Sequence, residues 1–127
     1  MSLAHRIRST DKPRITKQAP VKSSKYLAFI RTLPCVVTGT TPVDAAHVSY
    51  AAAEWGALGR GKGQKTSDRW ALPLCPDKHR EQHKGAEREF WAKQGIDPHR
   101  LACIIYGLWS ERGPEAWEIC RKIILKK

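Results

Sequence analysis

The stretch that most constrains the fold runs from Asp68 to His83 and reads DRWALPLCPDKHREQH. Its apolar run, WALPL, has the length and composition of a short buried strand. A helix is expected to begin near Pro76 and to end at Gly85, because proline is favoured in the first turn and glycine after the last. Within that helix His79 and His83 lie four residues apart, and therefore on one face.

The two imidazoles admit two interpretations. Aimed at one point, they can hold a divalent cation such as zinc, manganese or nickel, with Cys75 at or just before the first helical turn. Alternatively, the histidines fall in register by chance on a solvated helix rich in Lys, Arg and Glu. The metal interpretation is favoured because further candidate ligands lie upstream.

The composition indicates a folded, basic protein. At 127 residues, with a hydrophobic fraction of 41% and five Trp, the chain has room for one domain with a modest core. Its net charge of +11 comes from 23 Lys plus Arg against 12 Asp plus Glu, which favours a polyphosphate partner. We expect nucleic acid rather than a membrane, because the basic residues are spread over several segments and no apolar run could span a bilayer.

The cysteines indicate a reducing compartment. Four cysteines, scattered along the chain, are too few for a secreted disulfide framework, so we expect a cytoplasmic protein. Cys103 and Cys120 fall at apolar positions of expected helices, where a free thiol acts as a small hydrophobe.

The chain divides into an arm and one domain. Residues 1–25 carry seven Lys or Arg and one acidic residue, which predicts a mobile basic arm that attracts phosphates, or else a solubilising tail. Residues 26–127 are expected to form a single domain, with a core at 33–98 and C-terminal helices at 98–127. Within it we predict a helix at Tyr26–Leu33, a strand and turn at Cys35–Gly39, and a strand at Val43–Val48.

A long connection, residues 51–67, precedes the His-bearing stretch and begins with one expected helical turn at 51–55. Gly56 to Lys62 formally match the G-x-x-x-x-G-K phosphate loop, but Gly63 stands where that motif needs Ser or Thr, so we reject a nucleotide site. A basic loop that touches the DNA backbone through Arg60, Lys62 and Lys65 is the favoured interpretation, and a solvated linker is the alternative.

Three further helices are expected after the central stretch. The first covers Ala86–Lys93, the second begins at Pro98 with Asp97 as its N-cap and ends near Gly113, and Pro114 opens the third. Their apolar faces are expected to be core. His5 and His99 lie outside any cluster and are expected on the surface.

The segment from Leu33 to about Pro98 resembles the HNH nucleases of the ββα-metal (His-Me finger) superfamily. The matching residues are CVVTG, VDAAH and SDRWALPLCPDKHREQH, about half of the chain, and the CxxxHxxxH block after PLC is the most specific part. The resemblance is strongest to small phage and prophage members, including the RecA-dependent phage nuclease group. It implies an α+β fold with a β-hairpin, a metal-binding helix and additional flanking helices.

The resemblance also implies residue roles. By position, His47 resembles the general base that activates water, and Asp68 the second catalytic residue, which orients the base or binds metal. His79 resembles a metal ligand and His83 a further one. The implied cofactor is one divalent ion, with magnesium, manganese, nickel and zinc all open.

Two departures from the family pattern matter. Many relatives place an acidic or His ligand where this chain has Ala46, so Asp68 or Asp44 would have to substitute. A regular strand would point Asp44 to the face opposite His47, which makes Asp68 the better candidate.

The second departure concerns structural zinc, which many relatives hold with two cysteine knuckles. Cys35 and Cys75 remain here, but Thr38 and Lys78 stand at the second positions of the two knuckles. Two thiolates do not complete a four-coordinate site, so we expect neighbouring free thiols, with a disulfide only on oxidation.

The leading hypothesis is a metal-dependent HNH endonuclease that hydrolyses DNA phosphodiester bonds in phage or prophage recombination or DNA processing. Its expected substrate is double-stranded DNA in the cytoplasm of a bacterial host, and a recombinase filament remains open as a further partner. The alternative is a catalytically inactive DNA-binding or recombination-adaptor module of the same fold. His47 discriminates between the two, because a purely structural metal site needs no free imidazole.

Overall fold

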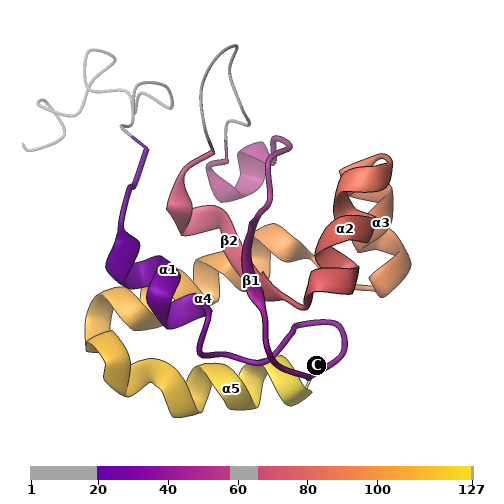
Figure 1. Cartoon of the computed structure of the whole chain (residues 1–127). Coiled ribbons are helices and arrows are strands. Elements are labelled where there is room, and N and C mark those ends of the chain that lie inside the picture. The colour runs from indigo at the N-terminus through magenta and orange to yellow at the C-terminus, as the bar shows by residue number, and fades with distance from the viewer. Residues whose placement is uncertain (1–19, 58–65, 127) are drawn as a thin grey trace, which may run out of the picture.

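The computed structural model describes residues 20–57 and 66–126 and has an α+β fold (Figure 1). The helices and strands follow in the order α1 (Ser24–Ile30), β1 (Asp44–His47), β2 (Ala71–Leu74), α2 (Pro76–Lys84), α3 (Glu87–Gln94), α4 (Pro98–Arg112) and α5 (Trp117–Lys126). Short 3-10 helices cover Ala53–Trp55 (η3), Asp68–Trp70 (η4) and Gly113–Ala116 (η5). No helix in these two ranges is long and apolar enough to cross a bilayer.

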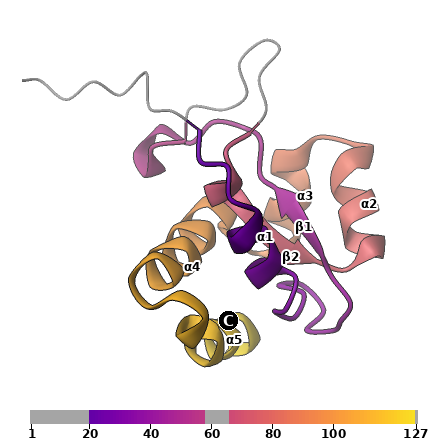
Figure 2. The same cartoon turned by 60° about the vertical axis from the view of Figure 1, so that its left-hand side comes forward.

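The two strands pair antiparallel, and the His-bearing helix follows them directly. Asp44 lies opposite Leu74, and His47 lies opposite Ala71. All four residues of β2 are buried, because the strand contacts α1, α2 and α4. In both views α2 and α3 lie on one side of the strand pair, and α4 and α5 lie on the other (Figures 1 and 2). The strands expected at Val43–Val48 and in the WALPL run are therefore present as an antiparallel pair, and the expected helix follows them.

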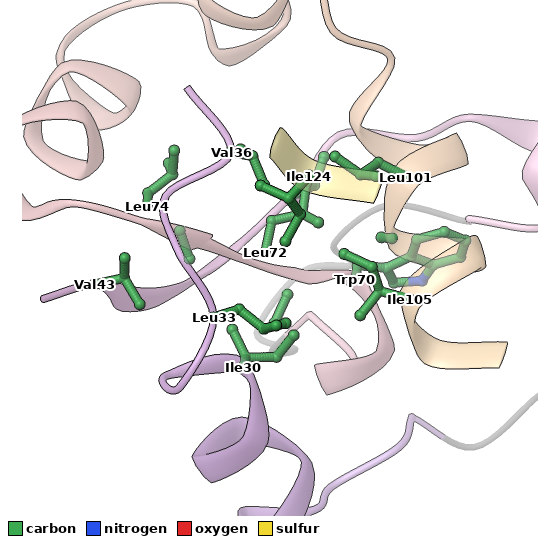
Figure 3. Packing of buried hydrophobic residues seen from close by; sticks show 14 of the residues in the cluster. Ile30, Leu33, Val36, Val43, Trp70, Leu72, Leu74, Leu101, Ile105 and Ile124 are labelled. Carbon is green, nitrogen blue, oxygen red and sulfur yellow. The ribbon is translucent and has the colours of Figure 1, made fainter. Parts of the chain in front are cut away.

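The hydrophobic core joins the strand pair to the N-terminal and C-terminal helices. Figure 3 shows Leu33, Leu72, Ile105 and Ile124 packed together, and each of these side chains is at most 2% exposed. Burying one such side chain stabilises the fold by about 1.5–3 kcal/mol relative to leaving it in water. The core thus holds β2, and through it the site, against α4 and α5.

Local signals place the helix ends close to their predicted positions. The Asp97 side chain accepts a hydrogen bond from the Arg100 backbone N–H, and Pro98 occupies the first turn of α4. The expected helical turn after residue 51 is η3, and α3 ends at Gln94. The last helix differs: η5 covers Gly113–Ala116, and α5 begins at Trp117.

Of the strand and turn predicted at Cys35–Gly39, the turn is confirmed and the strand is wrong. This segment is a turn, in which the backbone N–H groups of Val37 and Thr38 each point at Cys35 Sγ, 3.4 Å away. The N–H of Gly39 donates to the Cys35 carbonyl at 2.8 Å, and Gly39 adopts a φ of 75° that favours glycine. The sulfur and the carbonyl of Cys35 gather the donors that a strand would need for pairing.

The prediction that His99 lies on the surface is wrong, because its side chain is only 2% exposed. Its Nε2 donates to the Tyr50 carbonyl at 2.9 Å, and its ring packs edge-on against Tyr50 and Trp70. Burial lowers the pKa of His99 below its ordinary value of 6.5. This histidine fastens α4 to the chain that follows β1.

Candidate active site

One pocket of about 660 Å³ is lined by four residues that the sequence singled out, namely His47, Asp68, His79 and His83. They come from three elements, because β1 ends at His47, η4 begins at Asp68 and α2 carries both remaining histidines. Residues 20–24 supply another wall of the same pocket, of which Pro20, Lys22, Ser23 and Ser24 are lining residues. The candidate catalytic and metal-binding residues are therefore neighbours in space.

His47 and Asp68 form a hydrogen-bonded pair. Nε2 of His47 lies 2.8 Å from Oδ1 of Asp68. A carboxylate can only accept, so a neutral imidazole in this pair carries its proton on Nε2 and its lone pair on Nδ1. Among the residues of known placement, none makes a hydrogen bond to that Nδ1. A histidine held by a carboxylate in this way can act chemically as a general base.

Asp68 is itself fixed by the segment before α1. Its Oδ2 accepts the backbone N–H of Ser23 at 2.8 Å, and its own N–H donates to the Val21 carbonyl at 2.8 Å. The Val21 N–H in turn donates to Ser67 Oγ at 2.8 Å. The predicted arm boundary at residue 25 thus lies inside the folded part of the chain, since residues 21–23 are bound to the site. Residues 1–19 lie outside the described range.

The two histidines of α2 converge as the spacing predicts. Their Nε2 atoms lie 3.2 Å apart, about the separation of adjacent nitrogen ligands on a four-coordinate ion with bonds of about 2.0–2.1 Å. Nδ1 of His79 lies 3.0 Å from Oδ2 of Asp44, so the Nε2 of His79 carries the lone pair. A carboxylate behind a histidine is the usual outer partner of a metal ligand. His79 and His83 could thus supply two of the ligands of a divalent ion.

The roles predicted for the two aspartates need correction. Asp44 does not point away from the site, because its carboxylate contacts His79. The two carboxylate oxygens of Asp68 are hydrogen-bonded to His47 and to Ser23. The reason is that α2 begins two residues after Leu74, the partner of Asp44, so the helix passes beside the first residue of β1. Within residues 20–57 and 66–126, no group of three or more His, Cys, Asp or Glu could hold a metal ion, so the expected cluster of Asp68 with the two histidines is not found.

Three residues beside the pocket were missed by the sequence analysis. Gln82 of α2 is 2% exposed and donates from Nε2 to the His47 carbonyl and to Glu87 of α3. Glu87 also accepts hydrogen bonds from Ser49. The only available signal was the place of Gln82, three residues after His79 on the same helix. Nothing in the sequence pointed to Glu87 or Ser49.

The thiols Cys35 and Cys75 lie near one another, since Thr38 contacts both sulfurs. Its N–H points at Cys35 Sγ from 3.4 Å, and its hydroxyl lies 3.9 Å from Cys75 Sγ. Burial raises the pKa of the Cys35 thiol, but hydrogen bonds from Thr38, Cys75 and Val37 outweigh burial and bring that pKa below its ordinary value. Both cysteines are free.

The predicted DNA-contacting residues Arg60, Lys62 and Lys65 lie outside the described residues. Their segment joins the described chain at Thr66, which lines the pocket, as does Pro20, where the arm joins. Each basic segment is therefore next in sequence to a residue that lines the pocket.

Comparison with known proteins gives one match. A family model described as Protein of unknown function (DUF968) matches residues 12–106, a range that contains every residue named in this pocket. No curated protein and no solved structure matches the chain.

Proposed function

We propose that this chain, which belongs to the DUF968 family, is a metal-dependent endonuclease of the HNH type that hydrolyses DNA phosphodiester bonds. The observation that carries this proposal is the shared pocket. There, a histidine oriented by a carboxylate (His47 with Asp68) lies beside a pair of converging imidazoles (His79 with His83).

His47 acts as the general base in this proposal. Asp68 accepts a hydrogen bond from Nε2–H of His47, so the lone pair of the imidazole lies on Nδ1. Nδ1 then takes a proton from the attacking water. Asp68 also stabilises the imidazolium that results, because its negative charge lies 2.8 Å from the ring nitrogen.

His79 and His83 would hold the divalent ion, with Asp44 orienting the His79 ring. When bound, the ion would neutralise charge on the scissile phosphate and on the leaving oxygen. Magnesium, manganese, nickel and zinc remain the candidates, and imidazole ligands favour the last two.

The distribution of charge supports a polyanionic substrate. The described ranges contain 14 Lys or Arg and 11 Asp or Glu, which leaves them close to neutral. Most of the excess belongs to residues 1–19, with five basic and one acidic residue, and to residues 58–65, with three basic and none acidic. Both segments attach at the pocket, where a phosphate backbone would lie. We infer double-stranded DNA as the substrate, in phage or prophage recombination or DNA processing in the cytoplasm, with a recombinase filament as a candidate partner.

A nicking assay on supercoiled plasmid tests the proposal. The purified chain is incubated with magnesium, manganese, nickel or zinc, and conversion to open-circular or linear DNA is followed on gels. We expect cleavage that chelation stops and that a His47→Ala preparation, purified in parallel, lacks. If no metal supports cleavage while DNA still binds, the proposal is wrong.

A second candidate function is a DNA-binding module without catalysis. It is favoured by Ala46, which stands where many HNH nucleases have a metal ligand. It is also favoured by the finding that no third side-chain ligand joins His79 and His83 within the described ranges. The same assay separates the two candidates, because this module would bind plasmid without cutting it.

A further inference from the structure

Gln82 is a buried side chain of α2 that binds the backbone of the pocket residue His47. It is 2% exposed, and its Nε2 donates to the His47 carbonyl at 3.2 Å and to Glu87 Oε2 at 2.9 Å. Both partners are acceptors, which fixes the orientation of the amide, because only the NH₂ group can serve them. Each hydrogen of that group therefore has a defined partner.

Glu87 extends this contact to the other side of His47. Its carboxylate accepts the Ser49 backbone N–H at 3.1 and 3.2 Å and the Ser49 hydroxyl at 2.6 Å. The backbone is thus held at residue 47 through its carbonyl and at residue 49 through its amide. Gln82, Glu87 and Ser49 together form what we call the polar clamp.

We propose that Gln82 and Glu87 are positioning residues of this site, which set His47 relative to the His79–His83 pair. This inference rests on the proposed function. Gln82 follows His79 by three residues and precedes His83 by one, so a single turn of α2 carries both the imidazole pair and the donor that holds His47. The base and the ligand pair are thereby fixed in one rigid unit, and catalysis is sensitive to displacements of about 1 Å.

An exchange of the two side chains isolates the bond to His47. In the double variant Q82E/E87Q, the new amide at position 87 can donate to the carboxylate at position 82 and accept the Ser49 N–H. The carboxylate at position 82 has no hydrogen to give to the His47 carbonyl. The exchange therefore retains the hydrogen bond between α2 and α3 and removes the one to His47. Glu89→Gln, an exposed change on α3 that removes one negative charge as Glu87→Gln does, is the control.

We expect Q82E and E87Q alone to lower both the melting temperature and the cleavage rate. The exchange should raise the melting temperature above those of the single variants but leave kcat at least about tenfold below the parent, with unchanged KM for DNA and unchanged metal affinity. If kcat recovers together with the melting temperature, the clamp is merely structural and the inference is wrong.

A second readout does not depend on cleavage. NMR relaxation at the Cε1–H of His47 reports the mobility of its ring, which should increase in Q82E/E87Q and stay unchanged in Glu89→Gln. An inactive parent would refute the proposed nuclease, and this measurement would still decide the clamp, since unchanged ring mobility would overturn it. If the exchange variant does not fold, Gln82→Met, which loses both donors at similar length, takes the same two measurements with the same expected results.

Discussion

His47 and His79 are each bound by an aspartate, but the carboxylates engage opposite ring nitrogens. Asp68 takes Nε2 of His47 and leaves Nδ1, whereas Asp44 takes Nδ1 of His79 and leaves Nε2 directed at His83. Tautomer choice therefore assigns one imidazole to proton transfer and the other to metal binding, in the proposed function. Each role predicts a distinct response to substitution.

His47→Ala should lower the cleavage rate by about 10²–10⁴-fold while DNA binding and metal content stay nearly intact, because a general base acts in the transition state. His79→Ala should instead lower metal occupancy and activity together. Plasmid nicking, binding titrations and elemental analysis check both variants. If His47→Ala cuts as well as the parent, the base lies elsewhere and the assigned roles are wrong.

Asp44→Ala should weaken metal binding by about 10–100-fold, because the residue orients a ligand without being one. Isothermal titration with zinc or nickel measures the effect. Asp77→Ala, which removes an exposed carboxylate from the first turn of α2, serves as the control and should bind metal as the parent does. Equal affinities in the two variants would show that Asp44 does not support the ligand.

At the scale of elements, the sequence predicted those whose signals are local. The strand β2 and helix α2 followed from an apolar run, a proline and a glycine within a short stretch of chain. The strand expected within Cys35–Gly39 failed, because the Cys35 sulfur competes with strand pairing for the N–H groups of Val37 and Thr38. The alternation of side chains along β1 misplaced Asp44 for another reason. Alternation predicts only which face of the strand a side chain lies on, whereas Asp44 contacts α2 because that helix passes along the end of the strand.

The candidate site shows the same division. The convergence of His79 and His83 is a property of one helix and could be read from their spacing. The bonds from Ser23 to Asp68, from Gln82 to His47 and from Ser49 to Glu87 join residues 35–45 positions apart and depend on tertiary packing. Burial of His99 is likewise tertiary, since Tyr50 and Trp70 come from other segments.

The contact of α4 with the chain after β1 should make stability depend on pH. Because burial lowers the pKa of His99 in the folded state, the unfolded chain binds more protons below pH 6.5, and the free energy of unfolding should fall as the pH drops through that value. Urea unfolding at about pH 7.5 and 5.5 measures this decrease. His99→Gln keeps a donor for the Tyr50 carbonyl but cannot titrate, so its stability should fall less on acidification. Parallel decreases in the two proteins would contradict the prediction.

At the scale of the whole molecule, a nearly neutral body carries its excess positive charge on two segments that attach at one pocket. Because these two segments hold most of the excess positive charge, affinity for DNA should depend on them.

Removing residues 1–19 should flatten the plot of log affinity for duplex DNA against log salt concentration, by about 0.9 for each phosphate that the arm no longer neutralises. Replacing Arg60, Lys62 and Lys65 by Ala should act in the same direction. The truncation keeps the Ser23 N–H that holds Asp68, so kcat at saturating DNA should not change. Fluorescence anisotropy at several salt concentrations measures the slope. A slope that is unchanged after truncation would show that the arm is only a tail.

The pocket is divided between two stretches of chain, one ending at Ala57 and the other beginning at Thr66. His47 and Asp44 belong to the first, and Asp68, His79 and His83 belong to the second. Two polypeptides cut between residues 61 and 62 would each lack half of the proposed chemistry. A complete pocket would require the pairing of β1 with β2, the shared core and the hydrogen bonds that link the two stretches. DNA cleavage by a mixture of the two fragments would therefore report that they had associated into the native fold.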